Sequence, residues 1–298
     1  LAEGRGAWDK AAQALTTLLD VSGSNVELAM RLASARKELG DDAGVEAALK
    51  RALEAEPSNP DVRERLAQLY ERTKKWSELA TLLAEDAAIV AKNHAAEGGA
   101  APMTAPKMSI APGQSLPPPL PHIADQVRLL RRAADIHMKE RNQPADAIPV
   151  LERATSLVPL DRNLLLVLCD VYAKASRDRE AANVLERIIA SFGTKRTKEL
   201  SVYHHRLGKA LGALGDKDAA LAQFDMAFKI DPGSIEVLRD LGILAIETND
   251  LDRALKTFRA LLLQRLDANS PISKGEVFFY LGEISMKQGD KAKAIQML

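Results

Sequence analysis

The sequence predicts an all-α protein, a solenoid built from antiparallel helix pairs. Two observations support this fold class. The chain is 46% hydrophobic but only 4% aromatic and is rich in Ala and Leu, as helical proteins are. Its landmark residues also recur at a fixed interval, since Gly208 and Gly242 are separated by the same stretch of chain as Ala220 and Ala254. This period is typical of stacked helical repeats.

Each predicted unit contains two amphipathic helices that meet at a short Gly, Asn or Asp turn, such as Gly215 or Asn249. A small residue occupies the same place in the first helix of seven units. These small residues are Ala33, Ala67, Ala134, Cys169, Gly208, Gly242 and Gly282.

Glycine costs about 1 kcal/mol relative to alanine inside a helix, so Gly208 and Gly212 need an explanation. We expect Gly208 to face the small residue Ala220 of the second helix, because two such residues let the backbones approach closely. A larger side chain at Gly208 would then force the helices apart. Gly212 lies near the predicted concave face and has no comparable role, so it is interpreted as a mild cost.

With these landmarks the sequence resembles the tetratricopeptide-repeat family over nearly the whole chain except residues 98–121. It departs from the family where Leu238 and Phe278 replace the usual first-helix Trp, and where Val45 and Leu79 replace Ala. The resemblance implies a right-handed superhelix of about seven helical hairpins. Partial units at both ends lead us to expect that the array is truncated at both ends.

The predicted organisation has three parts. Residues 1–97 form an N-terminal array of a half repeat and two repeats, residues 98–121 a Pro/Gly-rich loop or linker, and residues 122–298 an array of about five repeats, the last truncated. Long helices over 76–96 and 123–140 suggest that the stack continues beneath the loop, whereas a hinge between two arrays is the alternative. The segment SLPPPLP could dock in an aromatic groove or fold back into this chain's own groove, but a passive spacer is favoured.

No catalytic motif is recognisable, so we expect a non-enzymatic protein without a cofactor or metal. Cys169 occupies a small-residue position and is interpreted as a packing residue. His204 and His205 are adjacent, and neighbours on a helix point about 100° apart, so they are poor ligands for one metal ion. We expect His204 to face a neighbouring helix and His205 the concave surface.

The formal net charge is zero, which argues against nucleic acid as the partner. The longest apolar run, Leu164 to Cys169, is far too short to cross a membrane, so no direct membrane insertion is expected. A single cysteine favours the cytoplasm, with the periplasm as the alternative.

In such solenoids the first helices line the concave face. A basic stripe in the middle of this groove is predicted to bind the partner, and its residues are Arg128, Arg131, Lys139, Lys174, His205 and Lys209. Farther along, the groove mixes acidic and apolar residues: Glu236, Arg239, Ile243, Glu247, Glu276, Phe279, Glu283 and Met286.

The stripe favours another protein or peptide, possibly acidic, as the partner. Some members of the family bind chaperone C-termini through a carboxylate clamp. That clamp uses Lys, Arg and Asn side chains. Here the matching positions hold Arg131 with Asp135 in place of Asn, and Val202 farther along, so the clamp is incomplete. The predicted function is therefore a non-enzymatic protein–protein interaction scaffold. The alternative is a regulatory or targeting arm of a larger enzyme, or of a cell-envelope assembly or secretion machine.

Overall fold

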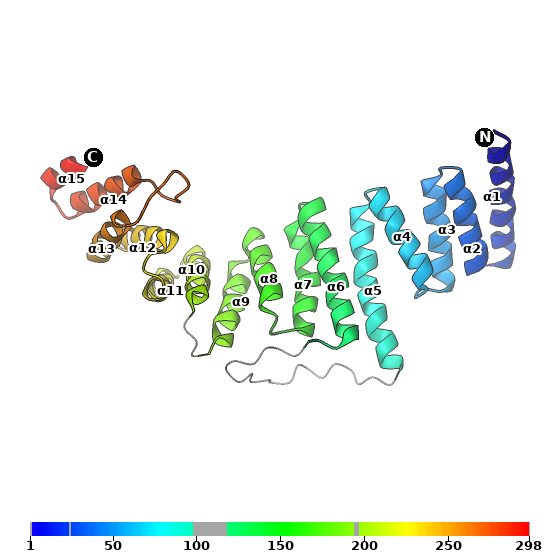
Figure 1. Cartoon of the computed structure of the whole chain (residues 1–298), viewed down its shortest axis with the longest axis horizontal. Coiled ribbons are helices and arrows are strands. Elements are labelled where there is room, and N and C mark those ends of the chain that lie inside the picture. Colours follow the sequence, from blue (N-terminus) through cyan, green and yellow to red (C-terminus); the bar gives the residue numbers. More distant parts are fainter. Residues whose placement is uncertain (1, 24, 98–117, 194–196, 298) are drawn as a thin grey trace. The chain divides into compact units, whose positions relative to one another are not determined.

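The computed structural model describes residues 2–23, 25–97, 118–193 and 197–297, and every regular element in these ranges is a helix (Figure 1). Consecutive helices pack in pairs, which confirms the predicted all-α fold class. The chain divides into two compact units on either side of Pro159 and Leu160. The predicted domain limits at residues 97 and 122 stay a prediction, since most of the segment between them lies outside the described residues.

The first unit contains seven α-helices and a π-helical turn in its described part. They are α1 (Ala2–Ser22), α2 (Val26–Glu38), α3 (Asp42–Ala55), α4 (Pro60–Arg72), α5 (Trp76–Ala96), α6 (Pro121–Asp135), η1 (Ile136–Glu140) and α7 (Pro144–Leu157). Within this unit α2 pairs with α3, α4 with α5, and α6 with α7.

The second unit contains eight helices in its described part. They are α8 (Arg162–Lys174), α9 (Asp178–Ser191), α10 (Lys198–Ala213), α11 (Lys217–Ile230), α12 (Ile235–Glu247), α13 (Leu251–Leu262), α14 (Lys274–Lys287) and α15 (Lys291–Met297). The even-numbered members of this unit are the first helices of their pairs, and the odd-numbered members are the second helices.

Local sequence chemistry sets the helix ends. Side chains such as Asn59, Asp161 and Ser234 accept a hydrogen bond from a backbone N–H of the first helical turn, which satisfies a donor that the helix leaves free. The turns inside the pairs use left-handed backbone, with φ of 84° at Gly215 and 60° at Asn249. Gly and Asn tolerate this conformation, which explains why they punctuate the sequence at these places.

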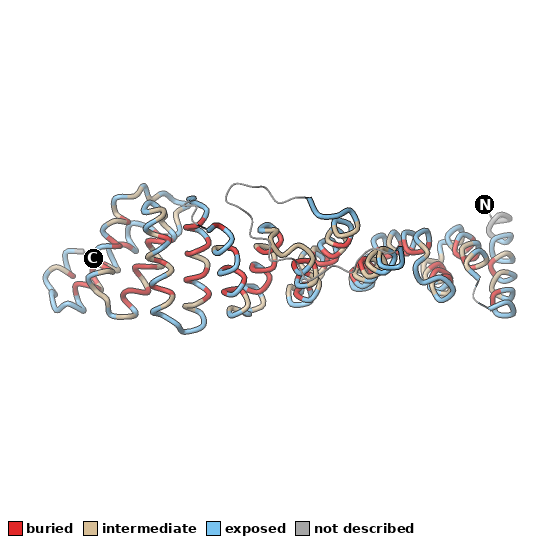
Figure 2. The backbone as a smooth tube through the Cα atoms, turned by 90° about the horizontal axis from the view of Figure 1, so that it is seen from below, coloured by how far each residue is buried: buried red, intermediate tan, exposed pale blue. Residues whose placement is uncertain are grey.

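Buried residues follow one side of each helix and fill the space between paired helices (Figure 2). The first unit has its own apolar core, with Leu49, Leu66 and Leu79 among its members. The second unit has another, which includes Phe224, Leu238 and Phe258. Each unit is therefore held together by the apolar stripes that the helical periodicity predicts.

Gly208 is needed for close packing against Ala220, as predicted, and a second residue, Phe224, also requires it. A Cβ atom at Gly208 would lie 2.5 Å from Cε1 of Phe224 and 3.2 Å from the backbone oxygen of Ala220. At Gly242 the corresponding distance is 2.7 Å, to the ring of Phe258. The expected partner Ala220 lies close through its backbone, and the ring of Phe224, one turn later, is closer still.

Gly212 is not constrained in this way. The nearest atom to a Cβ built at this position is Cβ of Ala220 at 3.8 Å, an ordinary van der Waals separation. The interpretation of Gly212 as a mild cost therefore agrees with the packing around it.

The π-helical turn η1 accommodates one extra residue. The stretch from Ala134 to Ala147 is longer by a single residue than the matching stretch from Gly208 to Ala220. In η1 the N–H of Arg141 donates to the oxygen of Ile136, five residues earlier, instead of four. The wider turn takes up the insertion locally, and Ala134 and Ala147 are both fully buried.

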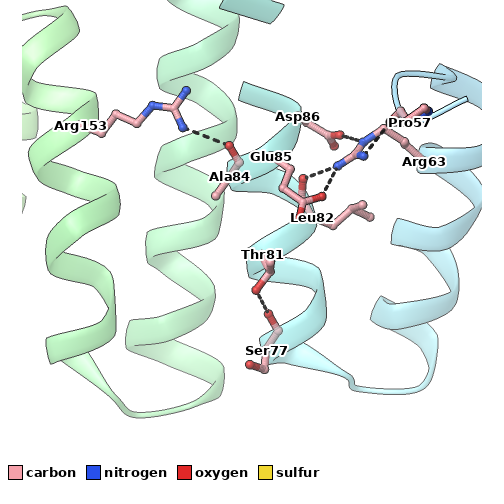
Figure 3. A network of polar contacts seen from close by, with 9 residues as sticks. All are labelled: Pro57, Arg63, Ser77, Thr81, Leu82, Ala84, Glu85, Asp86 and Arg153. Carbon is pink, nitrogen blue, oxygen red and sulfur yellow. Dashed lines mark hydrogen bonds and ion pairs between the residues drawn. The ribbon is translucent and has the colours of Figure 1, made fainter. Parts of the chain in front are cut away.

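The helices that flank residues 98–120 are long, as predicted, and belong to the same compact unit. The imidazole rings of His94 in α5 and His122 in α6 stack at a centroid distance of 3.5 Å. Arg153 of α7 donates to the backbone oxygen of Ala84 in α5 at 3.2 Å (Figure 3). These contacts show that repeats on either side of the segment pack directly against each other.

A buried arginine braces α4 against α5 (Figure 3). Arg63 donates to the backbone oxygens of Pro57 and Leu82 at 2.9 and 3.1 Å and forms ion pairs with Glu85 and Asp86. Its side chain is only 8% exposed. The guanidinium group is buried at little net cost because backbone and carboxylate oxygens accept its hydrogen bonds.

Candidate functional site

The first helices of neighbouring repeats are joined by polar contacts on one surface of each unit. In the first unit, Nη2 of Arg132 in α6 lies 3.1 Å from a carboxylate oxygen of Glu71 in α4. In the second unit, Arg206 of α10 pairs with Asp170 of α8, and Nε2 of His205 lies 2.7 Å from Oδ2 of Asp240 in α12. These side chains identify the surface on which the predicted groove residues lie.

Two of the three predicted residues in the first unit are already paired. Arg128 lies 3.1 Å from a carboxylate oxygen of Asp125, and Nζ of Lys139 lies 3.2 Å from Asp135. Lys139 lies in η1, so the π-helical turn sets its direction. Arg131 is exposed and has no ion-pair partner among the described residues.

In the second unit, His205 is not a free cation. Its side chain is 13% exposed, and it is held by Asp240 on one side and lies near the ring of Phe224 at 5.6 Å on the other. Lys174 and Lys209 are exposed, and no residue in the described part of the chain pairs with either. His204 faces the second helix instead, as predicted, where Nδ1 lies 2.8 Å from Oε1 of Gln223.

The buried carboxylate Asp240 is kept ionised. Burial opposes its ionisation, but hydrogen bonds from His205 and Arg239 outweigh that effect and hold the pKa of Asp240 below its ordinary value. Arg239 lies 2.7 Å from Asp240 and also donates to the backbone oxygen of Pro271 at 3.2 Å. The cation of Arg239 is therefore engaged inside the protein.

Sequence reasoning missed three residues of this surface: Arg132, Arg206 and Asp240. A signal for them existed in the repeat, since Arg132 and Arg206 each lie two residues before the small first-helix residue, as Arg65 does. Aligning the units at that position shows a recurring arginine that contacts the preceding first helix: Arg132 and Arg206 pair with a carboxylate there, and Arg65 donates to the hydroxyl of Ser34.

The far end of the second unit carries acidic and apolar side chains, as predicted. Glu247 pairs with Lys217 at 2.9 Å, and Glu283 with Lys287 at 3.4 Å. Glu236 and Glu276 are exposed and form no ion pair within the described ranges. Phe279 is 56% exposed.

Catalytic or metal chemistry has no visible basis in the described residues. No group of three His, Cys, Asp or Glu side chains there could hold a metal ion. Cys169 is buried in its small-residue position, and burial raises the pKa of its thiol, which disfavours the reactive thiolate. The part of the chain that the structure describes contains no helix long and apolar enough to cross a membrane.

Comparisons with known proteins match two segments of the chain. Family profiles described as tetratricopeptide repeat match residues 26–69, which span α2 to α4, and residues 213–272, which include α11 to α13. No curated protein matches the chain.

The chain is also similar to several solved structures. YrrB, described as a TPR protein with an unusual peptide-binding site, is 19% identical, with 57% of this chain and 81% of YrrB covered at a TM-score of 0.45. MamA from Desulfovibrio magneticus is 14% identical, with 57% and 90% covered at a TM-score of 0.47. A tetratricopeptide repeat protein from Parabacteroides merdae is 13% identical, with 91% and 90% covered at 0.38.

The two profile matches fall in different units, and both units are built from helix pairs with the same landmark residues. Proteins of this kind generally mediate protein–protein interactions and are typically non-catalytic. Residues 26–69 in the first unit and residues 213–272 in the second each match the tetratricopeptide-repeat family.

Proposed function

We propose that this chain is a non-enzymatic scaffold that binds a peptide or helix of a partner protein on its first-helix surfaces. One observation carries the proposal: Arg131, Lys174 and Lys209 are exposed and unpaired among the described residues, while the neighbouring cations Arg128, Lys139 and Arg206 are paired. A paired cation must leave its partner to bind a ligand, whereas an unpaired one is available at once. The surfaces therefore favour acidic segments.

A few charge-assisted hydrogen bonds are enough to account for specific binding. A hydrogen bond to a charged group contributes about 1.5–3 kcal/mol, so losing two such contacts weakens binding by about a hundredfold or more. Arg131 offers its contact in the first unit, and Lys174 and Lys209 offer theirs in the second. Each unit is treated as a binding surface by itself.

The test is a quantitative pull-down from the native lysate with the full chain. The groove variant is Arg131→Glu, Lys174→Glu and Lys209→Glu. A matched control carries the same charge change on exposed second-helix positions: Lys229→Glu, Lys256→Glu and Arg259→Glu. Circular dichroism first establishes that both variants keep their helix content.

We expect proteins captured by the parent chain to fall at least tenfold with the groove variant and to persist with the control. Equal capture by the parent chain and the groove variant would show that these cations do not bind the partner. Equal losses with both variants would show a general charge effect, which also contradicts the proposal.

A further inference from the structure

The first helices of the second unit form one continuous surface. Arg206 joins α10 to α8, the bond between His205 and Asp240 joins α10 to α12, and Nζ of Lys287 in α14 lies 3.5 Å from the backbone oxygen of Ile246 in α12. The order of helices on this surface is therefore α8, α10, α12 and α14. We refer to it as the second-unit surface.

One half of the second-unit surface has uncompensated positive charge. Lys174 on α8 and Lys209 on α10 are exposed and have no ion-pair partner in the described ranges. The nearby carboxylate of Asp170 is already neutralised by Arg206. The net effect is a pair of available ammonium groups on two adjacent helices.

The other half has negative charge outside ion pairs. Glu236 on α12 and Glu276 on α14 are exposed and form no ion pair with a described cation, although Arg239 attracts Glu276 from a longer distance. Each lies six residues before the small residue of its helix, Gly242 or Gly282, so they occupy matching positions on neighbouring first helices. The cation between them, Arg239, is engaged by Asp240 and the oxygen of Pro271.

Glu276 is held in its charged form. The backbone N–H of Ser273 and then its hydroxyl donate to the carboxylate, and these bonds hold the pKa of Glu276 below its ordinary value. The capping box at the start of α14 thus fixes both the position and the charge of this side chain.

Apolar side chains lie on the same helices. Val202 on α10 is 54% exposed at the position that matches Glu236 and Glu276 in the repeat, and Ile243 on α12 is half-buried. Val202 lies beside the helix that carries Glu236, at the same repeat position, and offers a contact point for an apolar residue of a ligand.

We propose that the second-unit surface binds a bipolar segment of a partner protein. The acidic side chains of that segment bind the lysines of α8 and α10, and its basic side chains bind the glutamates of α12 and α14. Apolar residues of the segment lie between its two charged ends, near Val202 and Ile243. The inference rests on the proposed function and adds the charge order of the partner to it. Charge complementarity at both ends fixes the direction in which the segment lies.

The spacing of the helices sets the length of the segment. Neighbouring helix axes are roughly 10 Å apart, so the two charged halves are about 20 Å apart across the helices. The lysines also lie at least seven residues farther along their helices than the glutamates, which brings the separation to about 24 Å. An extended chain covers about 3.4 Å per residue, which places the acidic and basic clusters about seven residues apart.

The experiment selects ligands from a random phage-displayed library of peptides about 12 residues long, enough to span both charged halves, on the full chain and measures them by fluorescence anisotropy. Two half-variants separate the charges: Lys174→Glu with Lys209→Glu, and Glu236→Lys with Glu276→Lys. The control is Lys229→Glu with Lys256→Glu on the second helices. We expect selected peptides to carry acidic and basic clusters about seven residues apart, and to lose at least tenfold in affinity with either half-variant but not with the control.

The outcomes distinguish this inference from the proposed function. If the lysine half-variant abolishes binding and the glutamate half-variant leaves it unchanged, the partner is simply acidic; the bipolar inference is then wrong and the proposed function stands. If the library yields no ligand, or both half-variants bind the selected peptides as the parent chain does, neither proposal holds for the second unit.

Discussion

The two units solve the same packing problem with different pairs of residues. In the first unit, alanine occupies the small first-helix position and leucine the matching second-helix position, as in Ala33 and Leu49. In two pairs of the second unit, glycine and phenylalanine occupy these positions, namely Gly208 with Phe224 and Gly242 with Phe258, whereas the first pair of that unit has Cys169 with Leu185. The smaller first residue accompanies the larger second one.

This difference shows that the total side-chain volume at the two facing positions is maintained from repeat to repeat, while the residue at each single position changes. Protein interiors are close-packed, so a methyl group added on one helix must be removed from the other. The aromatic pair in the second unit depends on glycine, whereas the leucine pair leaves room for the alanine Cβ. The variants below test this compensation in size between the two positions.

The largest effect is expected from emptying the aromatic position. Phe258 is fully buried, and Phe258→Ala should destabilise the protein by about 3–5 kcal/mol because it leaves a large cavity beside Gly242. Urea unfolding followed by far-UV circular dichroism measures the loss, with Leu49→Ala as the matched change in the first unit. A loss for Phe258→Ala below that for Leu49→Ala would contradict the claim that the second-unit pairs depend on the ring.

Gly208→Ala should destabilise the second unit by about 1–2 kcal/mol, because overpacking against Phe224 outweighs the gain in helix propensity. The control is Gly212→Ala on the same helix, where a Cβ meets nothing closer than 3.8 Å. That change should stabilise the protein by up to about 1 kcal/mol. Native-state hydrogen exchange in α10 and α11 reports both changes, and effects of the same sign would refute the distinction between the two glycines.

Combining Gly208→Ala with Phe224→Leu recreates the alanine–leucine pair of the first unit inside the second. The two changes should compensate each other by about 1 kcal/mol relative to the sum of the single variants, since residues in contact are coupled. A double-mutant cycle in urea measures this coupling free energy. Strict additivity of the two single effects would mean that the side chains at these positions do not compete for the same space.

The smallest effect concerns acid. The pKa of Asp240 is lower in the folded protein than in the unfolded chain, so its contribution to stability is present above the unfolded value and is lost as pH falls through the folded one. Asp240→Asn should therefore flatten the loss of stability in the second unit as pH falls below about 4, the ordinary pKa of an Asp carboxyl. Amide exchange in α10 and α12 measures the pH dependence, and an unchanged slope would show that Asp240 is not responsible for it.

The sequence predicts the helices well because their signals are local. Gly215 and Asn249 mark turns through their backbone conformation, and the apolar period identifies the buried stripes. The close approach of Gly208 to Ala220 is predicted from the repeat, but the contact with Phe224 is not, because only the packed helices show that this ring fills the space beside Gly208.

The candidate site was less predictable for the same reason. Arg128, Arg131 and Lys139 are all basic residues predicted to lie on the same face. Asp125 pairs with Arg128 and Asp135 pairs with Lys139, but no carboxylate pairs with Arg131 among the described residues. His205 has its partner 35 residues away, in the next first helix. Which charge is free depends on side-chain directions, and periodicity alone does not determine these.

The π-helical turn η1 has a consequence for how such an array can change over time. An inserted residue in a regular α-helix rotates everything after it by about 100°, which would turn buried side chains outward. Here the displacement is confined to five residues, Ile136 to Glu140, and Leu151 beyond it is still fully buried. A repeat array that grows by duplication of one unit can therefore tolerate a one-residue insertion in a copy. In this chain the insertion leaves Lys139 on a wider helical turn than the matching residues of other repeats.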